Sequence, residues 1–151
     1  MNTAFLESGY GTKSNHNFNL GVTNDEVIML DMDDTDFKTV QYWAERAMNW
    51  FELGGYVILK SSSGCYHILF NRSVDWPENM RVVAWVAQLS GNEGLQRWHR
   101  MQCIKMKSTL RVGPKNEKKS PCIVKRVGVQ NGQIQEFLEI RSEIKKVLKN
   151  L

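Results

Sequence analysis

The sequence contains little that would stabilise a fold covalently: its 151 residues include three cysteines and three prolines. Cys65, Cys103 and Cys122 are odd in number and far apart, with no Cys-x-x-Cys pair, which excludes a disulfide framework and a zinc ribbon. No apolar run approaches the roughly 18 residues that cross a bilayer. The polar opening segment has no signal-peptide core. We therefore expect a cytoplasmic protein that has free thiols and binds no membrane.

Acidic residues are nearly missing from one stretch. Between Arg97 and Arg126 ten Lys and Arg side chains accompany the single acid Glu117, a net charge of +9 in a chain of +4, so the remainder carries −5. Such a concentration is typical of phosphate-binding surfaces, because each phosphate contact releases counterions. A solvated basic surface is the alternative. The predicted nucleic-acid contacts are Arg97, Trp98, Arg100, Lys105, Lys107, Lys118 and Lys119.

Apolar periodicity predicts an α+β fold. Residues 27–151 are expected to form one domain, with residues 1–26 as a loop with one or two short strands packed on it. Apolar spacings of three and four predict helices over 37–53, 77–89 and 134–148, and place Trp43, Trp50 and Trp85 in the core. Short apolar runs predict strands over 27–30, 56–60, 66–70 and 122–129. In residues 103–110 two sets of side chains alternate loosely along the chain, which is typical of a strand.

Two carboxylates follow the first apolar strand. Asp31 and Asp33 are two residues apart, so on an extended chain they point to the same side and can share Mg²⁺ or Mn²⁺. We expect the strand that carries His67 to lie beside them, which would bring the imidazole to the same surface. Arg111 and Lys115 bracket a Gly-Pro turn, and this pair of cations suits a triphosphate.

Three stretches in this order resemble the archaeo-eukaryotic primase superfamily, the primase–polymerases. They are Val27-Ile-Met-Leu-Asp-Met-Asp33, Leu59-Lys-Ser-Ser-Ser-Gly-Cys-Tyr-His-Ile-Leu-Phe70 and Ser108-Thr-Leu-Arg-Val-Gly-Pro-Lys-Asn116. The resemblance implies an antiparallel sheet like that of an RNA-recognition motif, with helices packed on one face and an open face for metal, nucleotide and template.

The same resemblance implies a role for each matching residue. Asp31 and Asp33 would be catalytic and hold the metal, and Ser63, Gly64, His67, Arg111 and Lys115 would bind the nucleotide. The implied activity is a primase or polymerase reaction in replication, with nucleoside triphosphates, single-stranded or primed DNA and a replication protein as partners. Two metals would align the primer hydroxyl for in-line attack.

One part of that pattern is missing. The family places a third carboxylate shortly before the Leu-Arg element, whereas no Asp or Glu occurs between Glu93 and Glu117. Either Glu93 or Asp75 substitutes, or the third ligand is absent. The alternative is therefore a degenerate primase fold that only binds nucleic acid or nucleotide.

A third hypothesis is a haloacid-dehalogenase-like phosphatase. Its opening motif resembles residues 30–35, with Asp31 as nucleophile, Asp33 as general acid/base and Ser61 after the second strand. Such enzymes also need late carboxylates that bind magnesium, and no Asp follows Glu93.

Overall fold

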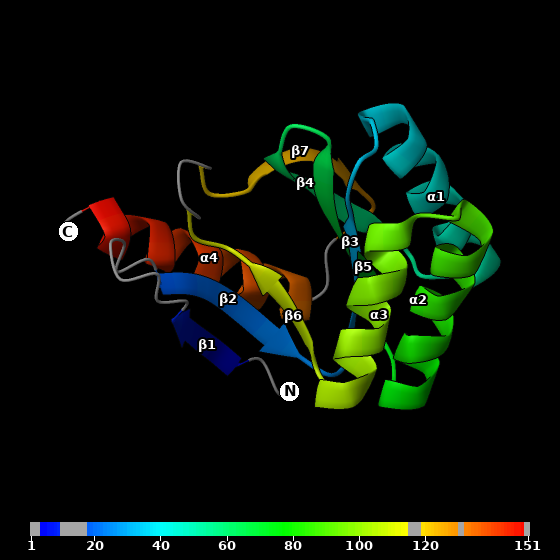
Figure 1. The fold of residues 1–151 in the computed structure, drawn as a ribbon, viewed down its shortest axis with the longest axis horizontal. Helices are drawn as coiled ribbons and strands as arrows, with labels where there is room; N and C mark the ends of the chain where they lie inside the picture. The colour runs from blue at the N-terminus through cyan, green and yellow to red at the C-terminus, as the bar shows by residue number, and fades with distance from the viewer. Residues whose placement is uncertain (1–3, 10–17, 115–118, 130–131, 150–151) are drawn as a thin grey trace.

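The computed structural model describes residues 4–9, 18–114, 119–129 and 132–149, and side chains within 21–114, 119–129 and 132–147. It contains seven strands and four helices in this described part (Figure 1). In chain order these are β1 (Ala4–Gly9), β2 (Phe18–Asn24), β3 (Val27–Met32), α1 (Phe37–Trp50), β4 (Tyr56–Ser62), β5 (Cys65–Ser73), α2 (Trp76–Ser90), α3 (Glu93–Lys105), β6 (Ser108–Arg111), β7 (Cys122–Val127) and α4 (Gly132–Lys149).

The strands form two antiparallel sheets, which confirms the α+β class. A three-stranded sheet has the order β1-β2-β6, and a four-stranded sheet has the order β3-β5-β4-β7. Because β5 is antiparallel to both β3 and β4, these two strands run in the same direction, and α1 connects them. Both strands in residues 1–26 form, and β2 pairs with β6 from the later part of the chain.

Local signals explain the first two helices. Asp36 caps α1 by accepting a 2.8 Å hydrogen bond from the Thr39 N–H, and the buried side chains of α1 recur every three or four residues. Asp75 caps α2 in the same way, and Gly91 ends it in the left-handed region with φ 66°. The predicted helices therefore form where the caps and the apolar period agree.

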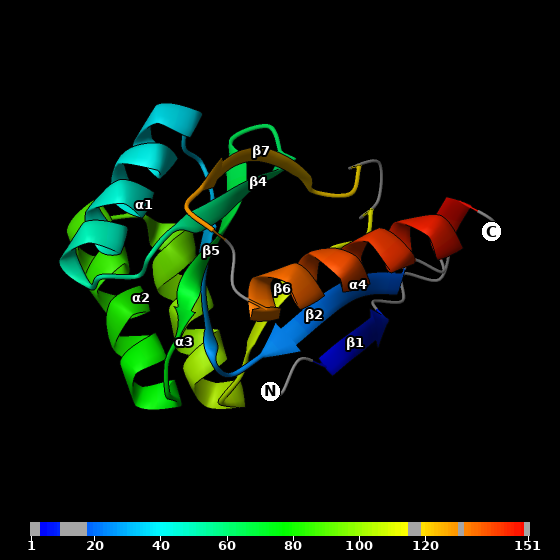
Figure 2. The same cartoon turned by 180° about the vertical axis from the view of Figure 1, so that it is seen from behind.

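Strands β3, β5 and β4 of the four-stranded sheet are buried on both faces, whereas the residues of the edge strand β7 are exposed or half-buried. One set of alternating side chains, represented by Ile28 and Ile68, packs against α1, α2 and α3. The other set, represented by Met29 and Leu69, packs against α4, β2 and β6 (Figures 1 and 2). The expectation of helices on one face and an open second face is therefore wrong. Strands β3, β4 and β5 are apolar on consecutive residues, as strands covered on both faces are.

The prediction of strand-like structure from residue 103 onward is wrong over its first part. Residues 93–105 form α3, and only Ser108–Arg111 form a strand. The Asn92 side chain caps α3 by accepting a 2.8 Å hydrogen bond from the Leu95 N–H. Leu95 and Gln102 are buried, which is helical spacing. The cap and this inward face outweigh the local alternation.

Trp50 is a second correction. Its side chain is 69% exposed and stacks on Trp85, with ring centroids 6.1 Å apart, whereas Trp43 and Trp85 are half-buried against the core as expected. Trp50 is the last residue of α1, so its ring extends past the end of the packed face.

None of the helices in the described ranges is both long enough and apolar enough to cross a membrane.

We predict that Gly55→Ala strongly destabilises the protein. Gly55 has φ +151°, and a Cβ there would lie 2.3 Å from both Asn71 Nδ2 and the Val127 carbonyl oxygen. Backbone strain and overpacking together should cost about 2–4 kcal/mol of unfolding free energy in urea. Gly132→Ala is the control, because no atom lies within 4 Å of its Cβ. Equal stability of the two variants would contradict the packing described for this strand end.

Candidate functional site

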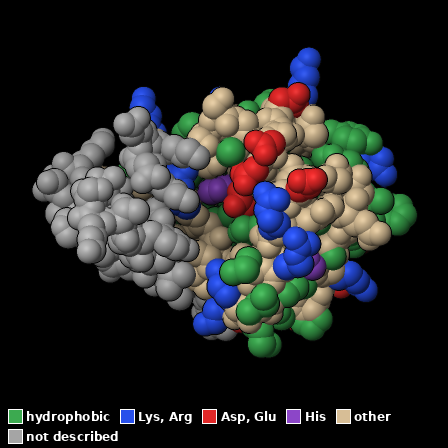
Figure 3. Space-filling model, viewed as in Figure 1, with side chains coloured by type: hydrophobic (Ala, Val, Ile, Leu, Met, Phe, Trp, Pro, Cys, Tyr) green, Lys and Arg blue, Asp and Glu red, His purple; other side chains and the backbone are tan. Residues whose placement is uncertain are grey.

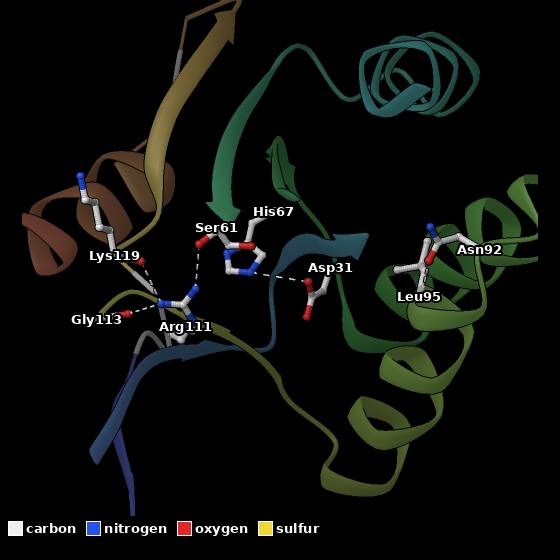
Figure 4. Close-up of polar contacts among 8 residues, drawn as sticks. All are labelled: Asp31, Ser61, His67, Asn92, Leu95, Arg111, Gly113 and Lys119. Atoms are coloured by element: carbon white, nitrogen blue, oxygen red, sulfur yellow. Dashed lines mark hydrogen bonds and ion pairs between the residues drawn. The ribbon is translucent and has the colours of Figure 1, made fainter. Parts of the chain in front are cut away.

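Asp31 and His67 meet at one end of the four-stranded sheet. The register of β3 and β5 places the two residues directly opposite each other, and the pair lies on the face that packs against α4, β2 and β6. His67 Nε2 lies 3.5 Å from Asp31 Oδ1 (Figure 4). The prediction that these strands are neighbours is therefore confirmed, and the imidazole and the carboxylate share one surface.

His67 is held in its neutral form. Its side chain is 4% exposed, and burial lowers the pKa of His67 to about 3, with the positive charge of Arg111 acting in the same direction. At neutral pH its approach to Asp31 is therefore a contact between a neutral ring and a carboxylate. A neutral imidazole has one N–H donor and one acceptor nitrogen, so His67 can donate a single hydrogen bond to an anion.

Arg111 connects the site to two other segments. Its guanidinium donates to the carbonyl oxygens of Ser61 at 3.0 Å, of Lys119 at 3.2 Å and of Gly113 (Figure 4). Burial lowers the pKa of Arg111, and the negative charge of Asp31 opposes that shift. A guanidinium has five N–H donors and stays protonated. Three donors bind the protein's own backbone, so at most two are left for a ligand.

Asp33 faces a different neighbour. A Cβ on Gly94 would lie 3.0 Å from Asp33 Cβ and 3.2 Å from its Oδ2, so this carboxylate lies against the first turn of α3. Asn92 Nδ2 donates a 2.7 Å hydrogen bond to the Asp33 carbonyl oxygen. The partial positive charge of a helix N-terminus favours a carboxylate there. Asp31 thus approaches His67 while Asp33 approaches α3, and a shared ion stays a prediction.

The β4–β5 turn lies against the segment that follows Asp33. The turn is Ser63-Gly64, where Ser63 is exposed and Gly64 has φ +71°. The Gly64 carbonyl oxygen accepts a 3.0 Å hydrogen bond from the Thr35 N–H. The resemblance implied that Ser63 and Gly64 bind the nucleotide, and the sequence did not predict the contacts of Thr35 and Asn92. Asn92 carried a signal, because an Asn followed by Glu93 is typical of a helix start.

The donor set determines which metal this site could hold. Among the described residues no group of three or more His, Cys, Asp and Glu side chains could hold a metal ion. Mg²⁺ usually binds through one or two carboxylates together with substrate phosphates and keeps several waters. Asp31 and Asp33 therefore suit an ion that arrives with a phosphate ligand and do not make a closed cage.

The structure also distinguishes the two substitutes for the third carboxylate. Glu93 directly precedes Gly94, which packs against Asp33, so Glu93 begins the helix at the site. Asp75 follows β5 at the opposite end of the sheet, where the Val74 N–H bonds to the Glu26 carbonyl oxygen. Glu93 is therefore the better placed of the two.

The basic residues expected to bind nucleic acid divide into three groups. Arg97, Arg100, Lys105 and Lys107 are exposed on or just after α3, and Lys119 is exposed before β7. Trp98 is half-buried and packs against both core clusters, which assigns its ring to the core and not to a base-stacking surface. Lys118 lies outside the described residues, as does Lys115, which was predicted to bind the nucleotide.

Basic and acidic side chains share one face of the molecule. Figure 3 shows Asp and Glu side chains gathered beside a His, with Lys and Arg side chains below them over α3. The exposed Met101 and Ile104 lie on the same helix. The site of Asp31 and Asp33 thus lies beside the basic side chains of α3.

Comparison with known proteins gives no match: no family model, no curated protein and no solved structure matches this chain.

We predict that His67 makes the protein sensitive to acid. The folded pKa of His67 is about 3, below the ordinary value of 6.5, so as pH falls below 6.5 the unfolded chain takes up a proton that the folded protein does not. Between pH 7.5 and 5.0 this linkage should remove about 2 kcal/mol of unfolding free energy. In His67→Gln the unfolding free energy should therefore fall less between these pH values than in the wild type. Urea titrations with a metal chelator present measure this difference.

The wild type, titrated under the same conditions, provides the comparison for that experiment. If His67→Gln and the wild type showed the same pH dependence, His67 would not be held neutral by burial.

We predict that Arg111→Lys weakens the fold although it keeps the charge. A single ammonium group cannot reach the three carbonyl oxygens that the guanidinium fork binds. Loss of two such bonds should cost about 1–3 kcal/mol of unfolding free energy, because they are part-buried or exposed and water can partly replace the lost donors. The exposed Arg100→Lys serves as the matched control and should change stability little. If Arg111→Lys unfolded at the same urea concentration as the wild type, the three guanidinium hydrogen bonds would not be needed for stability.

Proposed function

We propose that this protein is a primase–polymerase-like nucleotidyltransferase that binds nucleoside triphosphates and DNA through Mg²⁺ or Mn²⁺ and acts in replication or primer synthesis. The observation that carries the proposal is the arrangement at the sheet end. There Asp31 lies opposite His67, and Arg111 reaches the same end from β6. A carboxylate, a neutral imidazole and a guanidinium are together suited to a phosphate–metal ligand.

The order of the elements supports the proposal. Strand β3, helix α1, the β4–β5 hairpin, α2 with α3, and β6 follow one another. The middle strands have the order β3-β5-β4, and α1, α2 and α3 pack on one face. This is the sequence of elements expected of a primase-type core like an RNA-recognition motif, with the acidic residues at the end of its first strand.

Each side chain has a distinct role in this proposal. Asp31 and Asp33 would hold the metal, which when bound lowers the charge on the phosphates and orients them. His67 would donate its single N–H to a phosphate oxygen, and Arg111 would offer its remaining N–H donors. The Ser63-Gly64 turn and Lys115 would contact the triphosphate. The chain's own contribution would therefore be positioning and charge.

A second candidate function is binding without turnover. One observation favours it: no third carboxylate completes a metal cluster among the described residues. A metal held by two carboxylates and the ligand's phosphates would still bind nucleotide. With only two protein carboxylates as ligands, the metal would stabilise the negative charge on the reacting oxygens less well, and turnover would be slow. The phosphatase hypothesis is weaker, because no Asp follows Glu93 to supply the late paired carboxylates that it needs.

We expect Asp31→Asn to abolish metal-dependent nucleotide chemistry. Loss of a ligand carboxylate should reduce incorporation of labelled nucleotides on primed and unprimed templates by roughly 100-fold or more. Asp34→Asn is the matched control: it removes the same charge three residues away, and its φ of 51° is one that Asn tolerates.

The outcomes of this experiment separate the two functions. Incorporation by wild type and Asp34→Asn but not by Asp31→Asn supports the enzyme. Metal-dependent nucleotide binding that Asp31→Asn loses, without incorporation by any variant, supports the binding protein. Unchanged incorporation and binding in Asp31→Asn would refute both.

A further inference from the structure

A groove of about 600 Å³ lies beside the candidate site, at the other side of the β4–β5 turn. Its walls come from the end of β4, from residues 119–122 and from α4. This volume is in the range of small-ligand sites. The groove is lined by Lys60, Lys119, Lys145, Ser120, Cys122 and the serines at 61–63.

The described lining carries positive charge. Among the described residues it includes three lysines but no carboxylate and no aromatic side chain. Lys60, Lys119 and Lys145 form no ion pair with any residue in the described ranges, whereas the adjacent Lys146 lies 3.5 Å from Glu143. Three positive charges around one groove repel each other, so an anion that enters the groove is stabilised by all three.

Two arginines fix the backbone of the groove. Arg111 donates to the carbonyl oxygens of Ser61 and Lys119, which belong to different walls. Arg141, which is 7% exposed, donates to the Pro121 carbonyl oxygen through Nε at 2.9 Å and through Nη2. The walls are thus held in place before any ligand binds, which lowers the entropy cost of binding.

We propose that this groove binds the sugar–phosphate backbone of a single-stranded nucleic acid. Ammonium groups and serine hydroxyls are ligands for phosphate oxygens, and the lining offers no aromatic ring on which a base could stack. Binding in the groove is therefore independent of base sequence and strongly dependent on salt.

The location of the groove gives the strand a direction. Residues 61–63 line the groove, and the next residue, Gly64, bonds to Thr35 in the segment after Asp33. A strand in the groove therefore passes the β4–β5 turn toward Asp31. This direction rests on the proposed function, whereas strand binding itself does not.

The test is the affinity of a labelled oligo-dT, measured by fluorescence anisotropy over a range of salt concentrations. Lys60→Gln/Lys145→Gln should bind at least 10-fold more weakly in low salt. The slope of log affinity against log salt should fall by about 1.4, because each phosphate contact on a single strand contributes about 0.7. The control Lys125→Gln/Lys146→Gln has the same net charge and changes β7 and α4 outside the groove. Equal losses in the two double variants would overturn the proposal, as would an unchanged slope.

A second arm separates the strand from a free nucleotide. Metal-dependent binding of a deoxynucleoside triphosphate should be unchanged in Lys60→Gln/Lys145→Gln. Loss of nucleotide binding with intact oligo-dT binding would assign the groove to the triphosphate and overturn the proposal. Oligo-dT binding is measured in chelator and without nucleotide, so failure of the proposed metal site leaves this result intact.

Cys122 provides a readout that does not depend on removing charge. It is exposed and lines the groove, so in Cys65→Ser/Cys103→Ser it is the single thiol of the chain. Saturating oligo-dT should slow alkylation of Cys122 by maleimide at least 5-fold. An unchanged alkylation rate at saturation would show that the strand does not occupy the groove.

Discussion

The hydrogen bonds of the Arg111 guanidinium are the constraint on which the rest of the site depends. One side chain of β6 reaches carbonyl oxygens at the end of β4 and at Lys119, and so connects the three-stranded sheet to the four-stranded sheet and to the segment before β7. The half-buried positive charge of Arg111 also acts on its neighbours. It helps to keep His67 neutral, while Asp31 offsets part of the cost of burying the guanidinium. The geometry and the charge of the site thus come from the same group.

Strands β3, β5 and β4 are covered on both faces, so their polar residues are accessible at the strand ends. Helices α1, α2 and α3 occupy one face, while α4, β2 and β6 pack on the other. The polar residues of interest are therefore at the strand ends, where Asp31 and His67 share the second face and Asp33 continues to the start of α3. The lysine groove lies past the adjacent turn. A divalent cation that arrives with a phosphate ligand would neutralise the carboxylates at this end of the sheet, and the phosphate would complete its coordination.

Local rules of sequence predicted the elements, and pairing rules predicted part of the site. The Ser-Gly turn predicts the β4–β5 hairpin, and alternation then sets which side chains of these strands share a face. The pairing of β3 with β5, which brings Asp31 opposite His67, joins strands separated by α1 and β4, so the turn alone does not predict it. Helix α3 was missed because its cap at Asn92 was given less weight than an alternating pattern. The groove could not be predicted, because Lys60, Lys119 and Lys145 come together only through tertiary packing of α4 and the segment before β7. The exposure of Trp50 depends likewise on where α1 ends against α2.

The most direct test of the account is paramagnetic broadening by Mn²⁺ in ¹H–¹⁵N spectra, recorded with and without a deoxynucleoside triphosphate. The account predicts strong broadening centred on Asp31, Asp33 and His67 that requires the nucleotide, since two carboxylates suit an ion that arrives with phosphates. Broadening centred elsewhere, for example on Glu139 and Glu143 of α4, would contradict it. Equal broadening at the sheet end with and without the nucleotide would show that the ion binds there without a phosphate ligand.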